Sequence, residues 1–285
     1  MKISYPRRLA FYLGVTILLA WSLGPIYWSL ATSLMRQSDL STSPINLLPP
    51  QLTLDHYRKL LGGLLGQLNN TVWHDFSRAL RNSIVLALGA TVVTVTAAAF
   101  SAYATVRLRF PGRNLVFVLI VSTMAVPGYT VLIPLYRLMV SLGLINTYTG
   151  IILIYVSAFL PLAMWLMRSV YESLPLSLEE AAWIDGAGRF YTLIRIVLPL
   201  AAPGLIAAAI LTFLGAWGQF SVPLVFAPTL ETKPLTVLIP EFATKNDIDY
   251  GLINAAGILA MIPPALVVIF LNRYLMRGLM AGAGK

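Results

Sequence analysis

Long apolar runs separated by short polar stretches dominate the pattern of this chain. A helix needs about 20 mostly apolar residues to cross the hydrocarbon core of a bilayer, with a range of about 17–25. Six runs qualify, at residues 9–33, 83–103, 115–135, 150–167, 203–226 and 251–271. The pattern therefore predicts an all-α integral membrane protein of about six transmembrane helices, forming one domain over residues 1–285.

The first run follows Arg7 and Arg8, which is also how a secretory signal begins. Its apolar stretch is longer than a signal core of about 7–15 residues, and no clear small-residue cleavage site follows it. We therefore expect an uncleaved helix.

Small residues recur four positions apart in two of the runs. They are Ala90, Thr94 and Ala98 in the second run, and Gly251/Ala255 and Ala256/Ala260 in the sixth. Faces of small residues let helices approach closely in lipid. Packing within the chain is the favoured explanation, and contact with a partner subunit is the alternative.

Composition supports the membrane interpretation. Hydrophobic residues make up 58% of the chain and charged residues 11%, whereas a soluble domain carries about 25% charged residues. With no cysteine, disulfides and thiolate chemistry are excluded. The net charge of +9 is not accompanied by a basic helix or an aromatic-basic stripe, so we expect no nucleic-acid binding.

The basic residues are distributed unevenly between the two sides of the predicted spans. If the N-terminus is inside, the inner segments hold 12 cations and 4 acids, a net charge of +8, and the outer segments hold 8 cations and 7 acids, a net charge of +1. Because cytoplasmic loops carry the excess of Lys and Arg, both termini are predicted to be cytoplasmic. In the long first outer loop, residues 54–65 are amphipathic and could lie along the membrane surface.

The one long inner loop, residues 168–199, predicts two short helices joined by a turn. Ser177 and Glu180 have the spacing of a capping box. Gly186 is well placed to end the first helix in a left-handed conformation. The second helix is expected at about residues 189–197, with Pro199 closing it.

The same loop carries a motif with seven fixed positions: Glu180, Ala181, Ala182, Gly186, Ile196, Leu198 and Pro199. This motif resembles the EAA loop of binding-protein-dependent ABC importer permeases. The resemblance covers nearly the whole chain, since residues 80–83 and 109–113 are similar to the carbohydrate branch and residues 277–285 to the maltose-type second permease subunit. The chain departs from the family's pattern in two places. Gly188 stands where Ser or Thr often caps the second helix, and residues 217–220 differ from the family's commoner run, which leaves the substrate undetermined.

The resemblance implies the ABC type I importer permease fold and the task of translocating a sugar or oligosaccharide. The partners that it implies are a second homologous permease, two ATP-binding subunits, an extracytoplasmic sugar-binding protein and membrane lipid, in a bacterial or archaeal plasma (inner) membrane. The loop would dock in a cleft of an ATPase subunit, with Glu179, Glu180 and Asp185 facing basic groups. The tail, residues 282–285, would approach the ATPase interface, and residues 227–250 would touch the binding protein.

No phosphate-cradling loop is present, so ATP and Mg²⁺ are expected on the partner ATPase and this chain is expected to have no catalytic site, metal or cofactor of its own. His56 and His74 lack the spacing of a metal pair and are predicted to be solvated. No acidic residue lies at mid-depth in a span, which disfavours a proton-coupled secondary carrier.

Sugar contact calls for aromatic faces and amide groups. The candidates for the substrate pathway are Tyr129, Trp217, Gln219, Phe220 and Asn254. For Gln219 and Asn254, hydrogen bonding between helices is the favoured alternative. A permease of the same superfamily for glycerol phosphate or a polyol is the nearest rival function, and a secondary carrier is a more distant one.

Overall fold

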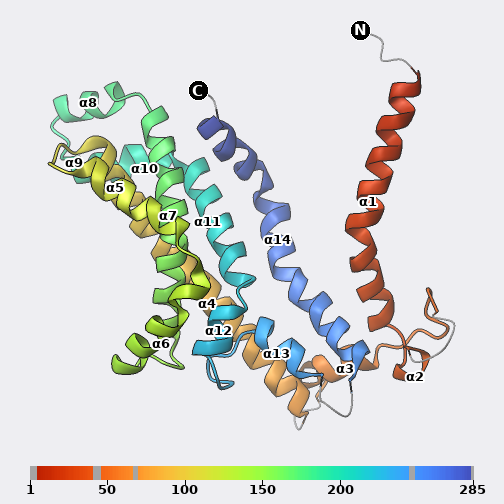
Figure 1. Cartoon of the computed structure of the whole chain (residues 1–285). Helices are drawn as coiled ribbons and strands as arrows, with labels where there is room; N and C mark the ends of the chain where they lie inside the picture. Colours follow the sequence, from red (N-terminus) through yellow and green to blue (C-terminus); the bar gives the residue numbers. More distant parts are fainter. Residues whose placement is uncertain (1–4, 41–45, 67–69, 244–247, 284–285) are drawn as a thin grey trace. The chain divides into compact units, whose positions relative to one another are not determined.

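The computed structural model describes residues 5–40, 46–66, 70–243 and 248–283, with side chains described within residues 11–271 of these ranges. Contacts divide the chain into two units: residues 1–77 with 238–262, and residues 78–237 with 263–285. Within the described ranges every regular element is helical, and an isolated bridge joins Ala243 to Ile248. The predicted all-α class is confirmed (Figure 1). Of the predicted tail, residues 284–285 and the side chains of 282–283 lie outside the described part.

The elements are bounded as follows. The first unit holds α1 (Tyr5–Ser33), α2 (Gln37–Leu40), α3 (Asp55–Leu60) and η1 (Gly62–Leu65). It also holds the beginnings of α4 (Thr71–Arg107) and α14 (Tyr250–Ala283). The residues of α13 (Leu235–Glu241) are divided between the two units. The second unit continues α4 with α5 (Arg113–Ser122), η2 (Thr123–Ala125), η3 (Gly128–Val131), α6 (Leu132–Ser141), α7 (Tyr148–Ser173), α8 (Ser177–Ile184), α9 (Arg189–Thr192), η4 (Leu193–Val197), α10 (Leu198–Leu200), α11 (Ala202–Trp217) and α12 (Ser221–Phe226).

Four helices in the described ranges are long and apolar enough to cross a membrane, and two bent pairs raise the count to six. The third predicted span is broken between residues 113–125 and 128–141, which meet at 96°. The break follows from Pro127, because a residue before proline is pushed into extended backbone, and Val126 has φ −79° and ψ 121°. The second bent pair turns by 76° between Leu200 and Ala202, just before the predicted fifth span, and the helix of that span ends at Trp217 rather than Phe226.

The small residues of α4 face the interior of the second unit. Ala90, Thr94 and Ala98 are each 0% exposed. Beside them, a Cβ added to Gly89 would lie 2.6 Å from the Ile152 side chain, so α4 packs closely on α7. The favoured explanation, packing within the chain, is confirmed for this face.

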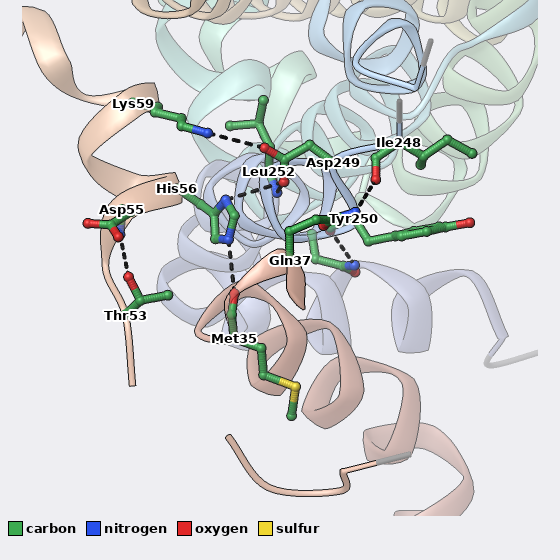
Figure 2. A network of polar contacts seen from close by, with 11 residues as sticks. Met35, Gln37, Thr53, Asp55, His56, Lys59, Ile248, Asp249, Tyr250 and Leu252 are labelled. Carbon is green, nitrogen blue, oxygen red and sulfur yellow. Dashed lines mark hydrogen bonds and ion pairs between the residues drawn. The ribbon is translucent and has the colours of Figure 1, made fainter. Parts of the chain in front are cut away.

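In the first unit, His56 is buried at 5% exposure, so the prediction that it is solvated is wrong. Its Nε2 lies 3.0 Å from the Met35 carbonyl oxygen and its Nδ1 lies 3.4 Å from an Asp249 carboxylate oxygen (Figure 2). The ring fits because Gly251 has no side chain, and a Cβ there would overlap the ring. Lys59 Nζ binds the other Asp249 oxygen at 3.3 Å, which closes the network. His74 is exposed, as predicted.

Candidate coupling segment and cleft

The segment with the EAA-like motif forms a helix, a turn and a second helix. The helix α8 begins at Ser177, and its N-cap is Leu176, which has no side-chain cap hydrogen bond. The predicted capping box is therefore wrong, because Ser177 is already the first helical residue and stands one position too late to cap. The backbone N–H groups of Glu179 and Glu180 instead donate to the Leu176 carbonyl at 2.9 and 3.0 Å.

The C-terminus of α8 confirms the role predicted for Gly186. This glycine has φ +86°. Its N–H donates to the Trp183 carbonyl at 3.1 Å, and the Ala187 N–H donates to the Ala182 carbonyl at 2.9 Å. These two bonds are the pair of a Schellman motif, which satisfies carbonyls at a helix end.

The second helix continues further than the sequence predicts. Gly188 is its N-cap, and the Thr192 N–H donates to the Gly188 carbonyl at 2.9 Å. A π-helical turn, η4, then contains Ile196, and α10 follows with Leu198 and Pro199. Pro199 does not close the helix, because it stands in the first turn of α10, where no backbone N–H is required.

Glu179 is held inside the protein, at 2% side-chain exposure. Arg107 Nε donates to one carboxylate oxygen at 2.6 Å, and the Tyr103 hydroxyl donates to the other at 2.9 Å. Arg107 Nη2 also donates to the carbonyls of Tyr171 and Leu174, at 3.0 and 2.9 Å. The expectation that Glu179 faces a partner is thus wrong, since its carboxylate is buried and paired with Arg107 and Tyr103 of the same chain.

The other side of α8 is open. Glu180, Ala181 and Asp185 are exposed, and Ile184 is 86% exposed. Ala182 faces inward at 8% exposure. Two acidic groups therefore flank an apolar side chain that has no cover within this chain's described residues.

One face of α4 supports the whole segment. Phe100, Tyr103 and Arg107 are spaced three and four residues apart, so they lie along one side of the helix. Phe100 stacks on Phe190 of α9 at a centroid distance of 6.4 Å and an angle of 4°. Both short helices, α8 and α9, thus contact the end of α4 that is predicted to lie near the cytoplasm.

A second feature is a cleft of about 720 Å³ where the two interrupted spans meet α7. Its wall includes residues on either side of the break at Pro127 and the residues that follow α11. The polar side chains that line it are Thr123, Tyr129, Ser157, Gln219 and Ser221. The described lining residues include no Asp, Glu, His, Lys or Arg, and the Tyr129 hydroxyl lies 3.1 Å from the Ser221 hydroxyl.

The cleft unites two of the five residues predicted for the substrate pathway, Tyr129 and Gln219. Trp217 is 9% exposed and stacks on Phe213 at 5.6 Å. Phe220 is 43% exposed but stands outside the lining.

Asn254 belongs to the other unit, and its amide donates to the Tyr250 carbonyl one turn back, at 2.8 Å. The hydroxyls of Ser157 and Ser221 were not predicted. For Ser157, the available signal is its position one turn before Pro161, a point at which a helix loses a backbone bond.

Near the N-terminal end of α7, side-chain hydrogen bonds hold the loop that follows α12. Asn146, at φ 58°, donates through Nδ2 to Thr229 Oγ1 at 2.7 Å and to a Glu231 oxygen at 2.8 Å. Asn82 Nδ2 donates to the carbonyls of Leu230 and Lys233, at 3.0 and 2.9 Å. The first part of the loop predicted to meet a binding protein is thus held in one shape.

Residues 78–280 match the protein family described as binding-protein-dependent transport system inner membrane component. The chain belongs to this family. The match covers the coupling segment and the cleft, and it confirms the membership suggested by the EAA-like motif. This transport-system component is therefore a multi-pass membrane permease.

Two relatives are similar over nearly their whole length. The trehalose/maltose transport system permease protein MalG of Thermococcus litoralis is 31% identical over 286 residues, covering 100% of this chain and 99% of the relative. The sulfoquinovosyl glycerol transport system permease protein SmoH of Agrobacterium fabrum is 34% identical over 278 residues, covering 96% and 93%.

A solved structure shares the fold of this permease. It is a bacterial ABC transporter involved in the import of the acidic polysaccharide alginate, and its matching chain has a TM-score of 0.81. The two chains are 23% identical, and the match covers 96% of this chain and 99% of the other. At this identity the likeness shows the fold alone.

Proposed function

We propose that this chain is the transmembrane permease subunit of an ATP-driven importer that translocates a sugar or oligosaccharide delivered by an extracytoplasmic binding protein. The observation that carries the proposal is the outward face of α8, where Glu180 and Asp185 flank the exposed Ile184. An apolar side chain ringed by charge is the usual composition of a docking surface. Its partner would be an ATPase subunit, which would bind ATP and Mg²⁺.

The uncharged cleft favours a neutral solute. Phosphate groups are bound in proteins mainly by Arg, Lys and clustered backbone N–H groups, and no Lys, Arg or His is among the described residues that line the cleft. Tyr129 offers an aromatic face and Gln219 an amide, which suit a polyhydroxylated ligand. The name of the relative MalG, a trehalose/maltose transport system permease, points to a neutral sugar, and the name of SmoH points to a sugar derivative. Glycerol phosphate is the less favoured substrate.

The remaining parts of the assembly follow from the same proposal. A second homologous permease and two ATPase subunits would complete the transporter, in a bacterial or archaeal plasma (inner) membrane with both termini cytoplasmic. The loop held by Asn82 and Asn146 would be the surface presented to the binding protein. This chain would have no catalytic role of its own.

Co-purification with ATPase and second-permease subunits tests the docking part. Glu180→Gln is expected to lower retention of the ATPase, because it removes an outward carboxylate. The matched control is Glu172→Gln, which makes the same change on α7, where Glu172 pairs with Arg168. Equal retention by both variants would refute docking through Glu180.

Uptake into proteoliposomes tests the solute. Maltose, trehalose, glycerol and glycerol 3-phosphate would be compared with and without ATP and binding protein. We expect ATP-dependent uptake of a sugar. Uptake without nucleotide would favour a secondary carrier, and uptake of glycerol 3-phosphate alone would overturn the sugar assignment.

A further inference from the structure

Arg107 lies where three helices of the second unit meet. It belongs to the last turn of α4. Its guanidinium binds the Glu179 carboxylate of α8, and it also binds two carbonyls at the C-terminus of α7. Only 11% of the Arg107 side chain is exposed. A planar guanidinium with a fixed fork of donors is suited to joining several acceptors at once.

We call this set of contacts around Arg107 and Glu179 the junction. Each of its hydrogen bonds pairs a donor with an acceptor of suitable charge. The two carbonyls that Arg107 binds lie at the C-terminal end of α7, where a cation is favoured by the helix dipole. Each Glu179 oxygen has one donor, from Arg107 or Tyr103. A buried ion pair keeps its geometry when its remaining hydrogen-bonding groups are satisfied. The junction therefore links α8 to both α4 and α7 through buried, hydrogen-bonded groups.

The position of the junction gives it a role that docking alone does not require. The opposite face of α8 carries Glu180, Ile184 and Asp185, the proposed contact with the ATPase. A force applied to that face reaches α4 and α7 directly through Glu179 and Arg107. Without the ion pair, α8 would still be joined to α7 by the short connection at residues 174–176, and the segment would keep the Phe100–Phe190 stacking, but a tilt of α8 would move α4 less.

We propose that Arg107 and Glu179 are positioning residues that transmit the movement of α8 to α4 and α7, so that they set how much solute is moved per ATP rather than whether the ATPase binds. This inference rests on the proposed function. It assigns distinct tasks to two adjacent glutamates: Glu180 faces the partner, and Glu179 faces Arg107.

The first test measures geometry and needs no solute. The chain has no cysteine, so Ser177→Cys on α8 and Arg109→Cys beyond α4, both at exposed positions, can be spin-labelled in the assembled transporter with cysteine-free partners. The distance distribution between the labels is expected to be narrow, and to broaden when Glu179→Gln is added. The control Glu172→Gln, whose ion pair stays within α7, is expected to leave the width unchanged.

The second test compares transport with ATP hydrolysis, using the sugar that the wild-type transporter imports. Glu179→Gln is expected to lower the amount imported per ATP by about 5-fold or more while the ATPase subunits remain bound. Arg107→Gln combined with Glu179→Gln is expected to be no worse than Arg107→Gln alone, because both changes remove the same ion pair. Arg107→Lys is expected to be intermediate, since it keeps the charge and loses the fork.

The inference would be overturned if Glu179→Gln left unchanged both the width of the label-distance distribution and the amount of sugar imported per ATP. A loss of ATPase binding that matches the loss of transport would also overturn it, because the residue would then serve docking alone. Failure of the wild-type complex to assemble or import would instead defeat the proposed function. If the complex assembles but does not import, the label distances would still test the connection between α8 and α4.

Discussion

The left-handed turn at Gly186 offers the sharpest test of the coupling segment. An L-residue with a Cβ at φ +86° is strained by about 1–2 kcal/mol. No heavy atom lies within 4 Å of the position that a Cβ would take at Gly186, so steric overlap adds nothing to that cost. Gly186→Ala should therefore destabilise the turn by about 1–2 kcal/mol through backbone strain alone.

The assay is titration of the purified permease complex with the ATPase subunit. If the turn must be formed for docking, the strain should raise the dissociation constant by about 5- to 30-fold. Gly186→Asn should have a smaller effect, because Asn tolerates the left-handed region better than other residues with side chains.

Gly188→Ala provides the matched control for this titration. It also has open space around its Cβ position, but its φ is −71°, which any L-residue adopts. We therefore expect wild-type affinity from Gly188→Ala. Equal affinities for Gly186→Ala and Gly188→Ala would refute the claim that the left-handed turn supports docking.

Three further substitutions test separate parts of the structure. Ile184→Ser should weaken ATPase binding by about 10-fold or more, because burying such a side chain contributes about 1.5–3 kcal/mol, while thermal unfolding of the isolated permease stays unchanged. Gly251→Ala should lower the unfolding temperature, since its Cβ would overlap His56 and overpacking costs about 1–3 kcal/mol; Gly257→Ala on the same helix, with open space, should not. Asn146→Ala should make the loop at residues 227–234 more sensitive to protease than Asn146→Gly does, because only alanine adds strain at φ 58° to the lost side-chain bonds.

Several features could be predicted from the sequence because they depend only on residues that are close together in the chain. Apolar runs indicate spans because every backbone polar group in lipid must be satisfied within a helix. Gly186 was identifiable as a helix end because glycine alone enters the left-handed region without strain. The face formed by Ala90, Thr94 and Ala98 was identifiable because small residues at a helical period allow close contact in any fold.

Other features depend on which segments meet in space. Glu179 and Glu180 are adjacent and chemically alike, and their tasks differ only because the chain brings Arg107, 72 positions earlier, against one of them. His56 looked solvated because the glycine that admits its ring is far along the chain.

The cleft likewise needs two breaks from different spans at one place, so Tyr129 and Gln219 line it while Trp217 turns into the packing of α11. The amino-acid pattern alone indicated the apolar runs, the left-handed turn at Gly186 and the family of this protein, but not where the helices break or end. Tertiary structure decided which polar groups are used internally and which remain for partners, because burial and pairing depend on contacts between residues distant in sequence.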